Sequence, residues 1–364
     1  MSERIKVIIA VGGTGGHVFP GCNLGSHLIE KNYNVRLITD KRGLRFLSKF
    51  KNLNFSILPA SPFIKKNIFT LLLSFFIIII SVLKSIFFLT FNRPSIIFGM
   101  GGYASFPVCI AATILKIKFV IYENNLVLGK ANKYLLPFAE KIFVSYKDLE
   151  GINEKYENKV LEIGNIIKKE IIDYSKKDTK KLIEKLNILV LGGSQAAKVF
   201  ANILPNIFLE SKKKGLPLKI FQHCLPDQSE KLKLYYEKVQ IEFETFNFID
   251  NLEELFPKIN LAITRSGSSV LAELTNACVP FISVPLPTSA DNHQLKNANF
   301  YQKKDFSFVI EEKDIQYKLF PLLNEIYTKK SLLNNISKNQ SQYSDKNVYI
   351  NINKALKKII NEKS

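Results

Sequence analysis

The chain has 364 residues, 46% of them hydrophobic, which suits two globular domains of ordinary size. Its four cysteines (Cys22, Cys109, Cys224 and Cys278) lie far apart without a C-x-x-C pair, so neither a zinc ribbon nor a disulfide framework is indicated. The net charge of +19 is mostly lysine without any nucleic-acid-binding motif, which argues against nucleic acid and favours an anionic membrane surface as partner.

The first apolar run, residues 5–10, leads into the glycine-rich stretch VGGTGGHVFPG at 11–21. The run is too short to indicate a secretory signal, so we expect no export. A glycine loop that opens a helix gathers backbone amides around an anion. The dinucleotide fingerprint G-x-G-x-x-G fails here because Val18 stands at its last position, so we expect a phosphate or a sugar rather than NAD. A glycine loop binds an anion without a histidine, so His17 calls for another role. The ordinary pKa of a histidine suits proton transfer.

Strand-like apolar runs alternate with helix-like stretches along most of the chain. This order predicts an α/β protein with parallel, doubly wound sheets. Two runs end in glycine loops that open helices, near residue 11 and at 189–195, which indicates two Rossmann-like halves facing a cleft. The lysine-rich stretch at 168–185 marks the junction between them. The predicted strands are 5–10, 35–39, 95–98, 119–122, 141–144, 187–191, 218–222, 259–264 and 281–284.

The segment 67–91 is the most apolar of the chain. About seventeen uncharged residues precede Lys84, fewer than the ~20 that cross a bilayer, although extension to residue 91 reaches that length. A span here would put runs 5–10 and 95–98 on opposite sides of a membrane, yet both are expected in one parallel sheet. We therefore predict a helix that packs on the sheet and lays its outer face in the lipid interface; a buried crossover helix is the alternative. The basic residues expected at the headgroups are Lys65, Lys66, Lys84 and Arg93.

Three stretches of the second half suit a nucleotide diphosphate. At 261–274, LAITRSGSSVLAEL, a strand runs into small and hydroxyl residues at a helix start, and Glu273 is placed to accept hydrogen bonds from ribose. Singly, these features are equally an ordinary helix cap and a first-turn acid. The stretch 191–195, LGGSQ, supplies a facing loop. After a proline-punctuated loop within 284–300 come neutral groups able to bind sugar hydroxyls, namely His293, Gln294 and Asn297.

Polar side chains also follow two predicted strands of the first half. The stretches FGMGGYASFP at 98–107 and IYENNLVLGKANKY at 121–134 lie at the carboxyl edge of the sheet, as His17 does. Ligands of open α/β folds bind at this edge. We therefore expect a cleft wall formed by His17 with Tyr103, Glu123 and Asn125.

Taken in order, the stretches GGTGGHVFPG, GMGGY, ENN, GGSQ, RSGSSVLAEL and DNHQLKNA resemble the MurG family, over about residues 5–300. These peripheral transferases move N-acetylglucosamine from its UDP carrier onto the undecaprenyl-pyrophosphoryl-muramyl-pentapeptide intermediate of peptidoglycan synthesis. The resemblance implies a GT-B fold at the cytoplasmic side of the inner membrane. Its amino domain, 1–165, would receive the acceptor and touch the membrane through residues 63–93, while the carboxyl domain, 166–345, would hold UDP-N-acetylglucosamine. A final helix in 346–364 would pack back on the first domain.

The resemblance also implies roles for particular residues. His17 or Glu123 would take the proton of the acceptor's 4-hydroxyl as the anomeric carbon inverts, or either would orient the acceptor. No metal or cofactor is implied: the sequence has no D-x-D motif, so helix dipoles would stabilise the departing UDP. The implied acceptor-side residues are Thr14, Gly15, Gly16, Tyr103 and Asn125. The implied donor-side residues are Asn125, Lys168, Gly193, Ser194, Gln195, Ile249, Ser268, Glu273, His293, Gln294 and Asn297.

Several positions depart from the family pattern. Tyr122 and Asn124 stand where the family has His and Gln, and Ala196 replaces a glycine of the donor loop. Ile166 and Lys168 replace a proline and an arginine, and a lysine keeps the charge of arginine but loses its bidentate fork. These changes bear on donor affinity more than on the identity of the reaction.

Other functions remain open to the sequence. A nicotinamide oxidoreductase would use residues 12–16 and Asp40, at the end of the second predicted strand, but the glycine spacing is wrong. A non-catalytic membrane scaffold, whose function would lie in the apolar helix, is another alternative. The ordered donor-side motifs argue against it, because a scaffold would not need them. Within the enzyme class, a related transferase that glycosylates diacylglycerol is the nearest competitor, because no residue here specifies a peptide stem or a polyprenyl chain.

Overall fold

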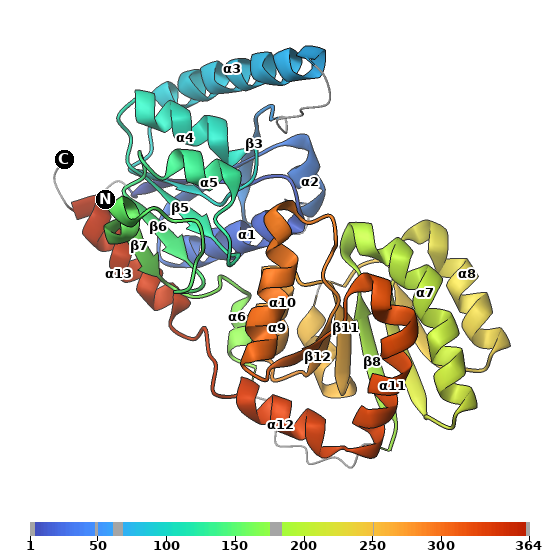
Figure 1. Cartoon of the computed structure of the whole chain (residues 1–364). Coiled ribbons are helices and arrows are strands. Elements are labelled where there is room, and N and C mark those ends of the chain that lie inside the picture. Colours follow the sequence, from blue (N-terminus) through green and yellow to red (C-terminus); the bar gives the residue numbers. More distant parts are fainter. Residues whose placement is uncertain (1–3, 48–49, 61–67, 175–183, 250, 362–364) are drawn as a thin grey trace. The chain divides into compact units, whose positions relative to one another are not determined.

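The computed structural model describes residues 4–47, 50–60, 68–174, 184–249 and 251–361. The chain divides into two compact units, one made of residues 1–168 with 345–364 and the other of residues 169–344. Each unit has its own parallel sheet, so the predicted α/β class with two doubly wound sheets is confirmed (Figure 1).

The sheet of the first unit has seven strands in the order β3-β2-β1-β4-β5-β6-β7, all parallel. β1 lies near the middle, where Val7 pairs with Val35 on one side and with Ile96 on the other. Its strands are β1 (Lys6–Ala10), β2 (Asn34–Thr39), β3 (Asn54–Ile57), β4 (Ile96–Gly99), β5 (Phe119–Glu123), β6 (Lys141–Val144) and β7 (Val160–Glu162). Its helices are α1 (Gly15–Glu30), α2 (Lys41–Leu47), α3 (Ile68–Phe91), α4 (Ser105–Ile114), α5 (Lys130–Leu135), the 3₁₀ turn η1 (Glu154–Lys159) and α13 (Val348–Asn361).

The sheet of the second unit has six parallel strands in the order β10-β9-β8-β11-β12-β13. Its strands are β8 (Leu186–Leu191), β9 (Leu218–His223), β10 (Glu242–Phe246), β11 (Leu261–Thr264), β12 (Phe281–Ser283) and β13 (Ser307–Val309). Its helices are α6 (Lys169–Ile172), α7 (Gly193–Lys213), α8 (Pro226–Lys238), α9 (Ser268–Asn276), α10 (His293–Lys303), α11 (Ile315–Thr328) and α12 (Ser331–Gln340). Short 3₁₀ turns are η2 (Leu252–Glu254), η3 (Phe256–Lys258), η4 (Ala290–Asn292) and η5 (Glu312–Asp314).

Four observed strands are absent from the sequence prediction, and all four are edge strands. β3 and β7 bound the first sheet, and β10 and β13 bound the second. An inner strand of a parallel sheet is covered on both faces and forms a continuous apolar run, whereas an edge strand needs no such run. β10, with the sequence EFETF, alternates charged or polar residues with phenylalanine and is not fully buried at any position.

The carboxyl-terminal helix α13 belongs to the first unit. Tyr349 on α13 donates a hydrogen bond from Oη to the carbonyl of Ile167 at 2.6 Å, and its ring lies 4.4 Å from that of His27 on α1. Just before α13, the buried Asp345 accepts a 2.8 Å hydrogen bond from the backbone N–H of Asn165. The segments where the chain leaves and re-enters this unit are therefore bound to each other.

Helix α3 connects β3 to β4, two strands of the same sheet. Within the described residues it is the one helix long and apolar enough to cross a membrane by length and composition, over Leu71–Phe91, yet only 17% of this stretch is buried in the protein. That exposure disagrees with the alternative of a buried crossover helix. α3 packs chiefly on α4 rather than directly on the strands (Figure 1).

The face of α3 that is turned inward is formed by small residues. Ser74, Ser81 and Ser85 are buried at helical spacing, together with Leu89. The hydroxyls of Ser81 and Ser85 donate to the carbonyls of Ile77 and Ser81, each at 2.7 Å, so their polar groups are satisfied within the helix. α3 therefore buries short polar side chains and leaves most of its large apolar ones outside.

Candidate functional site

The loops that follow β1, β2, β4 and β5 meet at the carboxyl edge of the first sheet, because these strands are parallel neighbours. The loop after β1 opens helix α1 at Gly15, and Gly13 has a left-handed φ of 84°. The N-cap residue Thr14 makes no side-chain capping bond, and the first turn of α1 holds no acid. The amino end of this helix thus offers backbone N–H groups and positive dipole charge, and no acidic side chain of its own first turn competes for them.

His17 lies on the first turn of α1 beneath the loop that follows β4. A Cβ atom on Gly101 would stand 3.0 Å from His17 Cε1, and one on Gly102 would stand 3.2 Å from Cδ2. Both glycines also have positive φ, 86° and 76°. The pair in the GMGGY stretch therefore makes room for the imidazole ring, a reason that the sequence alone did not give.

Glu123 is buried at the end of β5, and its carboxylate serves its own loop. It accepts hydrogen bonds from the N–H of Gly129 at 2.9 Å, from Asn132 Nδ2 at 3.0 Å, and from the backbone and side-chain amides of Asn125 at 3.1 Å each. Both carboxylate oxygens are thus occupied by donors that hold the loop. The arrangement favours an orienting role for Glu123, and it adds Asn132, which the sequence analysis did not single out.

The two departures beside Glu123 have structural partners. Asn124 Nδ2 donates to the carbonyl of Gly16 at 3.0 Å, which joins this loop to the glycine loop of α1. Tyr122 Oη lies 2.8 Å from Ser145 Oγ and accepts from the backbone N–H of Ile166 at 3.1 Å. Burial raises the pKa of Tyr122 well above its usual range, so the phenol stays neutral. Both residues therefore support loops of the first unit.

In the second unit, the loops after β8 and β11 also lie at a carboxyl edge. Gly193 begins α7 with a φ of 59°, and, apart from its chain neighbours and its own helix backbone, no described heavy atom lies within 4 Å of a Cβ built on it. Ser266, just before α9, is fully buried, and its hydroxyl has no hydrogen-bond partner among the described residues. Open space and an unused hydroxyl next to two helix starts suit an anionic ligand.

Gln294 and Asn297 on α10 hold the loop before α9. Gln294 Oε1 accepts from the backbone N–H of Ser266 at 3.2 Å and from that of Leu286 at 3.0 Å. The fully buried Asn297 donates from Nδ2 to the carbonyl of Ser266 at 3.1 Å. The structure therefore gives both amides a loop-building role.

The other donor-side candidates are placed as follows. His293 begins α10 and contacts the Ala290 carbonyl through Nδ1 at 2.8 Å. Ser268 and Glu273 lie on α9, Ile249 follows β10, and Lys168 ends the first segment of the first unit. The side chains of Ser194 and Gln195, in the first turn of α7, lie outside the described residues.

Arg265 was not singled out by the sequence analysis. Its buried guanidinium donates from Nη1 to the carbonyls of Val284 at 3.2 Å and Pro285 at 3.3 Å, and it forms an ion pair with Glu312. These contacts fix the segment after β12 beside the α9 loop. The arginine of RSGSS is thus a scaffold residue, and its burial identifies it as one.

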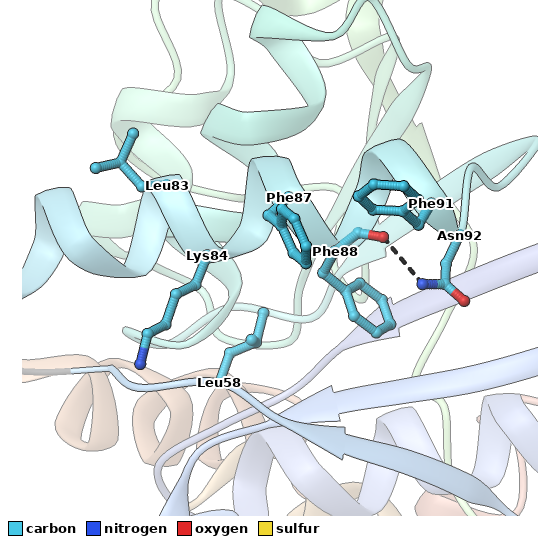
Figure 2. A pocket seen from close by; sticks show the side chains of 7 residues that line it. All are labelled: Leu58, Leu83, Lys84, Phe87, Phe88, Phe91 and Asn92. Atoms are coloured by element: carbon cyan, nitrogen blue, oxygen red, sulfur yellow. Dashed lines mark hydrogen bonds between the residues drawn. The ribbon is translucent and has the colours of Figure 1, made fainter.

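The outward face of α3 is a second candidate surface. Near its carboxyl end is a groove of about 630 Å³ lined by Leu58, Leu83, Lys84, Phe87, Phe88, Phe91 and Asn92 (Figure 2). Lys65 and Lys66 lie outside the described residues. Arg93 donates from Nη2 to the Leu115 carbonyl at 3.1 Å, at the end of α4. The exposed apolar residues of the helix are Phe69, Leu72, Leu73, Phe75, Phe76, Ile79, Leu83, Phe87 and Phe91.

Comparison with known proteins gives matches along nearly the whole chain. The glycosyltransferase family 28 N-terminal domain matches residues 7–144, and the glycosyltransferase family 28 C-terminal domain matches residues 187–350. A Pelagibacter ubique protein named UDP-N-acetylglucosamine–N-acetylmuramyl-(pentapeptide) pyrophosphoryl-undecaprenol N-acetylglucosamine transferase is 38% identical, over 98% of this chain and 99% of its own. A Rickettsia felis protein of the same name is 36% identical, over 85% and 87%. The crystal structure of Acinetobacter baumannii MurG covers 97% of this chain and 99% of its own with a TM-score of 0.76 at 22% identity, which confirms the predicted GT-B fold.

The loop-building role of Gln294 leads to a prediction about stability. In Gln294→Ala, the N–H groups of Ser266 and Leu286 lose their acceptor, and the buried Ser266 group left unsatisfied costs about 1 to 3 kcal/mol. We expect urea unfolding to show that the free energy of unfolding falls by about this amount in Gln294→Ala. The fall should be smaller in Gln294→Glu, which keeps an acceptor oxygen. Gln302→Ala, at an exposed position of the same helix, is the control. Equal stability of Gln294→Ala and this control would contradict the assignment.

Proposed function

The chain belongs to glycosyltransferase family 28 and within it to the MurG family, and we propose that it transfers N-acetylglucosamine from UDP-N-acetylglucosamine to N-acetylmuramyl-pentapeptide-pyrophosphoryl-undecaprenol. The 4-hydroxyl of the muramyl sugar attacks, and the anomeric carbon inverts. The observation that carries the proposal is the 38% identity to the Pelagibacter ubique transferase over 98% of the chain. The reaction places the chain in peptidoglycan synthesis.

His17 is the proposed base of the reaction. The attacking hydroxyl must lose its proton as the bond to the anomeric carbon forms, and a neutral imidazole can accept that proton. The ring lies at the carboxyl edge, next to the amino end of α1 and against Gly101 and Gly102. Thr14, Gly15, Gly16 and Tyr103 surround this position and form the proposed acceptor side.

Glu123 is proposed to orient the acceptor side instead of taking the proton. Its carboxylate already accepts from Gly129, Asn132 and Asn125, so a substrate hydroxyl would have to displace one of these donors. Through them it fixes the position of Asn125, the residue assigned to both substrates. A charged group that holds a loop rigid lowers the cost of ordering it around substrate.

The second unit is proposed to hold UDP. The departing diphosphate gains negative charge, which the amino end of α9 can stabilise through its N–H groups and dipole. Ser266 adds a buried hydroxyl without a partner among the described residues, and Gly193 leaves room for the backbone to approach a phosphate. The other proposed donor residues are Asn125, Lys168, Ser194, Gln195, Ile249, Ser268, Glu273, His293, Gln294 and Asn297.

We also propose that α3 holds the enzyme on the cytoplasmic face of the membrane without crossing it. Both strands that flank α3 belong to one sheet, which a crossing would divide between two compartments. The row of exposed leucine, isoleucine and phenylalanine side chains gains free energy in the lipid interface, and Lys84 is placed beside it to reach acidic headgroups.

A transfer assay tests the reaction. Radiolabelled N-acetylglucosamine in its UDP form is offered with a short-chain analogue of the muramyl lipid, and in parallel with diacylglycerol. We expect label in the muramyl lipid alone. Label in diacylglycerol alone would support the proposed donor but show that the proposed acceptor is wrong. The absence of label in both lipids would show that the proposed reaction is wrong.

The base assignment predicts a specific change in the pH profile. A base acts only when unprotonated, so the wild-type rate should fall as the pH drops through its pKa, and His17→Ala should lose this dependence along with about 10²- to 10⁴-fold in kcat. Glu123→Gln should lower kcat but keep the fall at low pH, because it leaves His17 in place. Near-full activity of His17→Ala would show that another group is the base.

The membrane assignment predicts the effect of removing apolar side chains from α3. Moving one large apolar side chain from water into lipid gains about 1.5 to 3 kcal/mol. We therefore expect Leu72→Ser with Phe76→Ser to weaken binding to phosphatidylglycerol vesicles at least about tenfold in co-sedimentation. Tyr317→Ser, which removes an exposed aromatic ring from α11 in the second unit, is the control and should bind as wild type. Equal binding of all three proteins would refute a membrane role for α3.

A further inference from the structure

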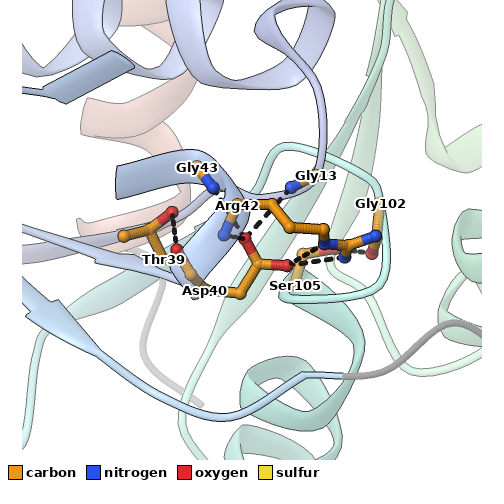
Figure 3. Close-up of polar contacts among 7 residues, drawn as sticks. All are labelled: Gly13, Thr39, Asp40, Arg42, Gly43, Gly102 and Ser105. Carbon is orange, nitrogen blue, oxygen red and sulfur yellow. Dashed lines mark hydrogen bonds and ion pairs between the residues drawn. The ribbon is translucent and has the colours of Figure 1, made fainter. Parts of the chain in front are cut away.

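Asp40 is a buried carboxylate at the end of β2 that the proposed reaction does not use. Its Oδ1 accepts from the backbone N–H groups of Gly43 at 2.8 Å, Arg42 at 3.1 Å and Gly13 at 3.4 Å (Figure 3). The first two bonds make it the N-cap of α2, and the third joins α2 to the glycine loop of α1. The role as a ribose-binding acid of a nicotinamide enzyme is thereby excluded, since the carboxylate is occupied.

Gly43 makes room for this arrangement. A Cβ atom on Gly43 would stand 2.2 Å from Thr39 Oγ1 and 3.5 Å from Asp40 Oδ1. Only glycine lets the third residue of α2 approach the cap so closely. The segment therefore holds Asp40 in one orientation, with Oδ2 directed at the side chain of Arg42.

Arg42 is held by this second oxygen and remains open to solvent. Its Nε and Nη2 donate to Asp40 Oδ2 at 2.8 and 2.5 Å, while its side chain is 43% exposed. The guanidinium lies 5.8 Å from the ring centre of Tyr103, and Nη2 is the one atom within 4 Å of a Cβ built on Gly13. The bonds to Asp40 use Nε and Nη2, so Nη1 takes no part in this ion pair.

A helix cap alone does not explain Arg42. The cap of α2 uses the backbone N–H groups of residues 42 and 43, which any side chain at position 42 would leave intact. The bond to Asp40 does something further, because it fixes a planar donor next to Gly13, in the glycine loop that precedes α1. An oriented guanidinium beside helix N–H groups matches the oxygens of a phosphate better than a mobile lysine would.

We propose that Arg42, oriented by Asp40, binds the pyrophosphate of the lipid-linked acceptor. The inference rests on the proposed function, which gives the acceptor a pyrophosphate and assigns it to this unit. Arg42 acts as a binding residue and Asp40 as a positioning residue. Thr14, whose side chain makes no capping bond, lies beside Gly13 and adds a hydroxyl to the same anion site.

Kinetics of Arg42→Ala test the proposal. We expect the KM for the muramyl-lipid analogue to rise at least tenfold and the KM for UDP-N-acetylglucosamine to stay within twofold. Arg45→Ala is the matched control: it removes the same charge from the same helix, but Arg45 lies over Phe46 instead of facing Asp40. An unchanged acceptor KM in Arg42→Ala, or an equal rise in the donor KM, would overturn the proposal.

Further variants separate binding from support of the fold. Arg42→Lys keeps the charge without the fork and should give an intermediate acceptor KM. Asp40→Asn keeps a capping oxygen but no charge for the guanidinium, so its acceptor KM should also rise. Arg42→Ala also removes the partner of a buried carboxylate, so its melting temperature should fall under either role. A purely structural role predicts that both KM values rise together, whereas binding predicts a rise in the acceptor KM alone.

A binding measurement separates this inference from the proposed reaction. With saturating UDP occupying the donor side, calorimetry records the binding of inorganic pyrophosphate to wild type, Arg42→Ala and Arg45→Ala. We expect pyrophosphate to bind wild type and Arg45→Ala but not Arg42→Ala. If pyrophosphate binds wild type and Arg45→Ala but not Arg42→Ala, and wild type transfers no sugar to the muramyl lipid, the proposed reaction is wrong and the proposed anion site is supported. If transfer occurs and Arg42→Ala binds pyrophosphate as wild type does, the anion site fails and the reaction stands.

Discussion

Parallel pairing of β1 with β2 on one side and β4 on the other is the constraint on which the acceptor side depends. It brings the loops after these three strands to one edge, where glycine lets their backbones touch. A Cβ on Gly12 would stand 2.3 Å from that of Ala104, and one on Gly102 would stand 3.0 Å from the Gly12 carbonyl oxygen. His17 of α1 then packs against Gly101 and Gly102 in the loop after β4. Asp40, after β2, accepts from Gly13 in the loop after β1. The glycines of this edge therefore act as packing residues, in addition to the binding role proposed for their loop.

Some polar residues of both units make hydrogen bonds that hold loops, whether or not they also bind substrate, and others keep donors that are proposed to bind a ligand. Glu123, Gln294 and Asn297 are occupied by backbone or amide partners, so their main contribution is to fix positions before substrate arrives. A loop that is already rigid loses little conformational entropy when the transition state forms. Residues that hold such a loop therefore favour catalysis by fixing the positions of other groups. Ser266, Arg42 and the amino ends of α1 and α9 keep the donors that an anion needs.

The sequence predicted the inner strands, because burial on both faces leaves a long apolar run, and it predicted the loops before α1, α7 and α9, because glycine marks these helix starts. It did not reveal β3, β7, β10 and β13, whose edge positions impose no such run. Nor did it reveal Arg42, which reads as an ordinary basic residue on a short helix. Its orientation depends on Asp40, which in turn accepts a hydrogen bond from the backbone N–H of Gly13, 27 positions away. The donor and acceptor identities came from resemblance, since no single residue specifies them.

Helix α3 shows why composition alone could not decide between a core helix and a membrane-facing one. Both readings need many apolar residues, and the difference lies in which face is buried. Here Ser74, Ser81 and Ser85 face inward, where short side chains let α3 approach the alanine-rich α4 closely, and the phenylalanines face outward. A continuous apolar face of this size is unfavourable in water and favourable against lipid. Because α3 belongs to the unit that carries His17 and Arg42, membrane contact would hold the acceptor loops near the surface where a polyprenyl-linked sugar resides.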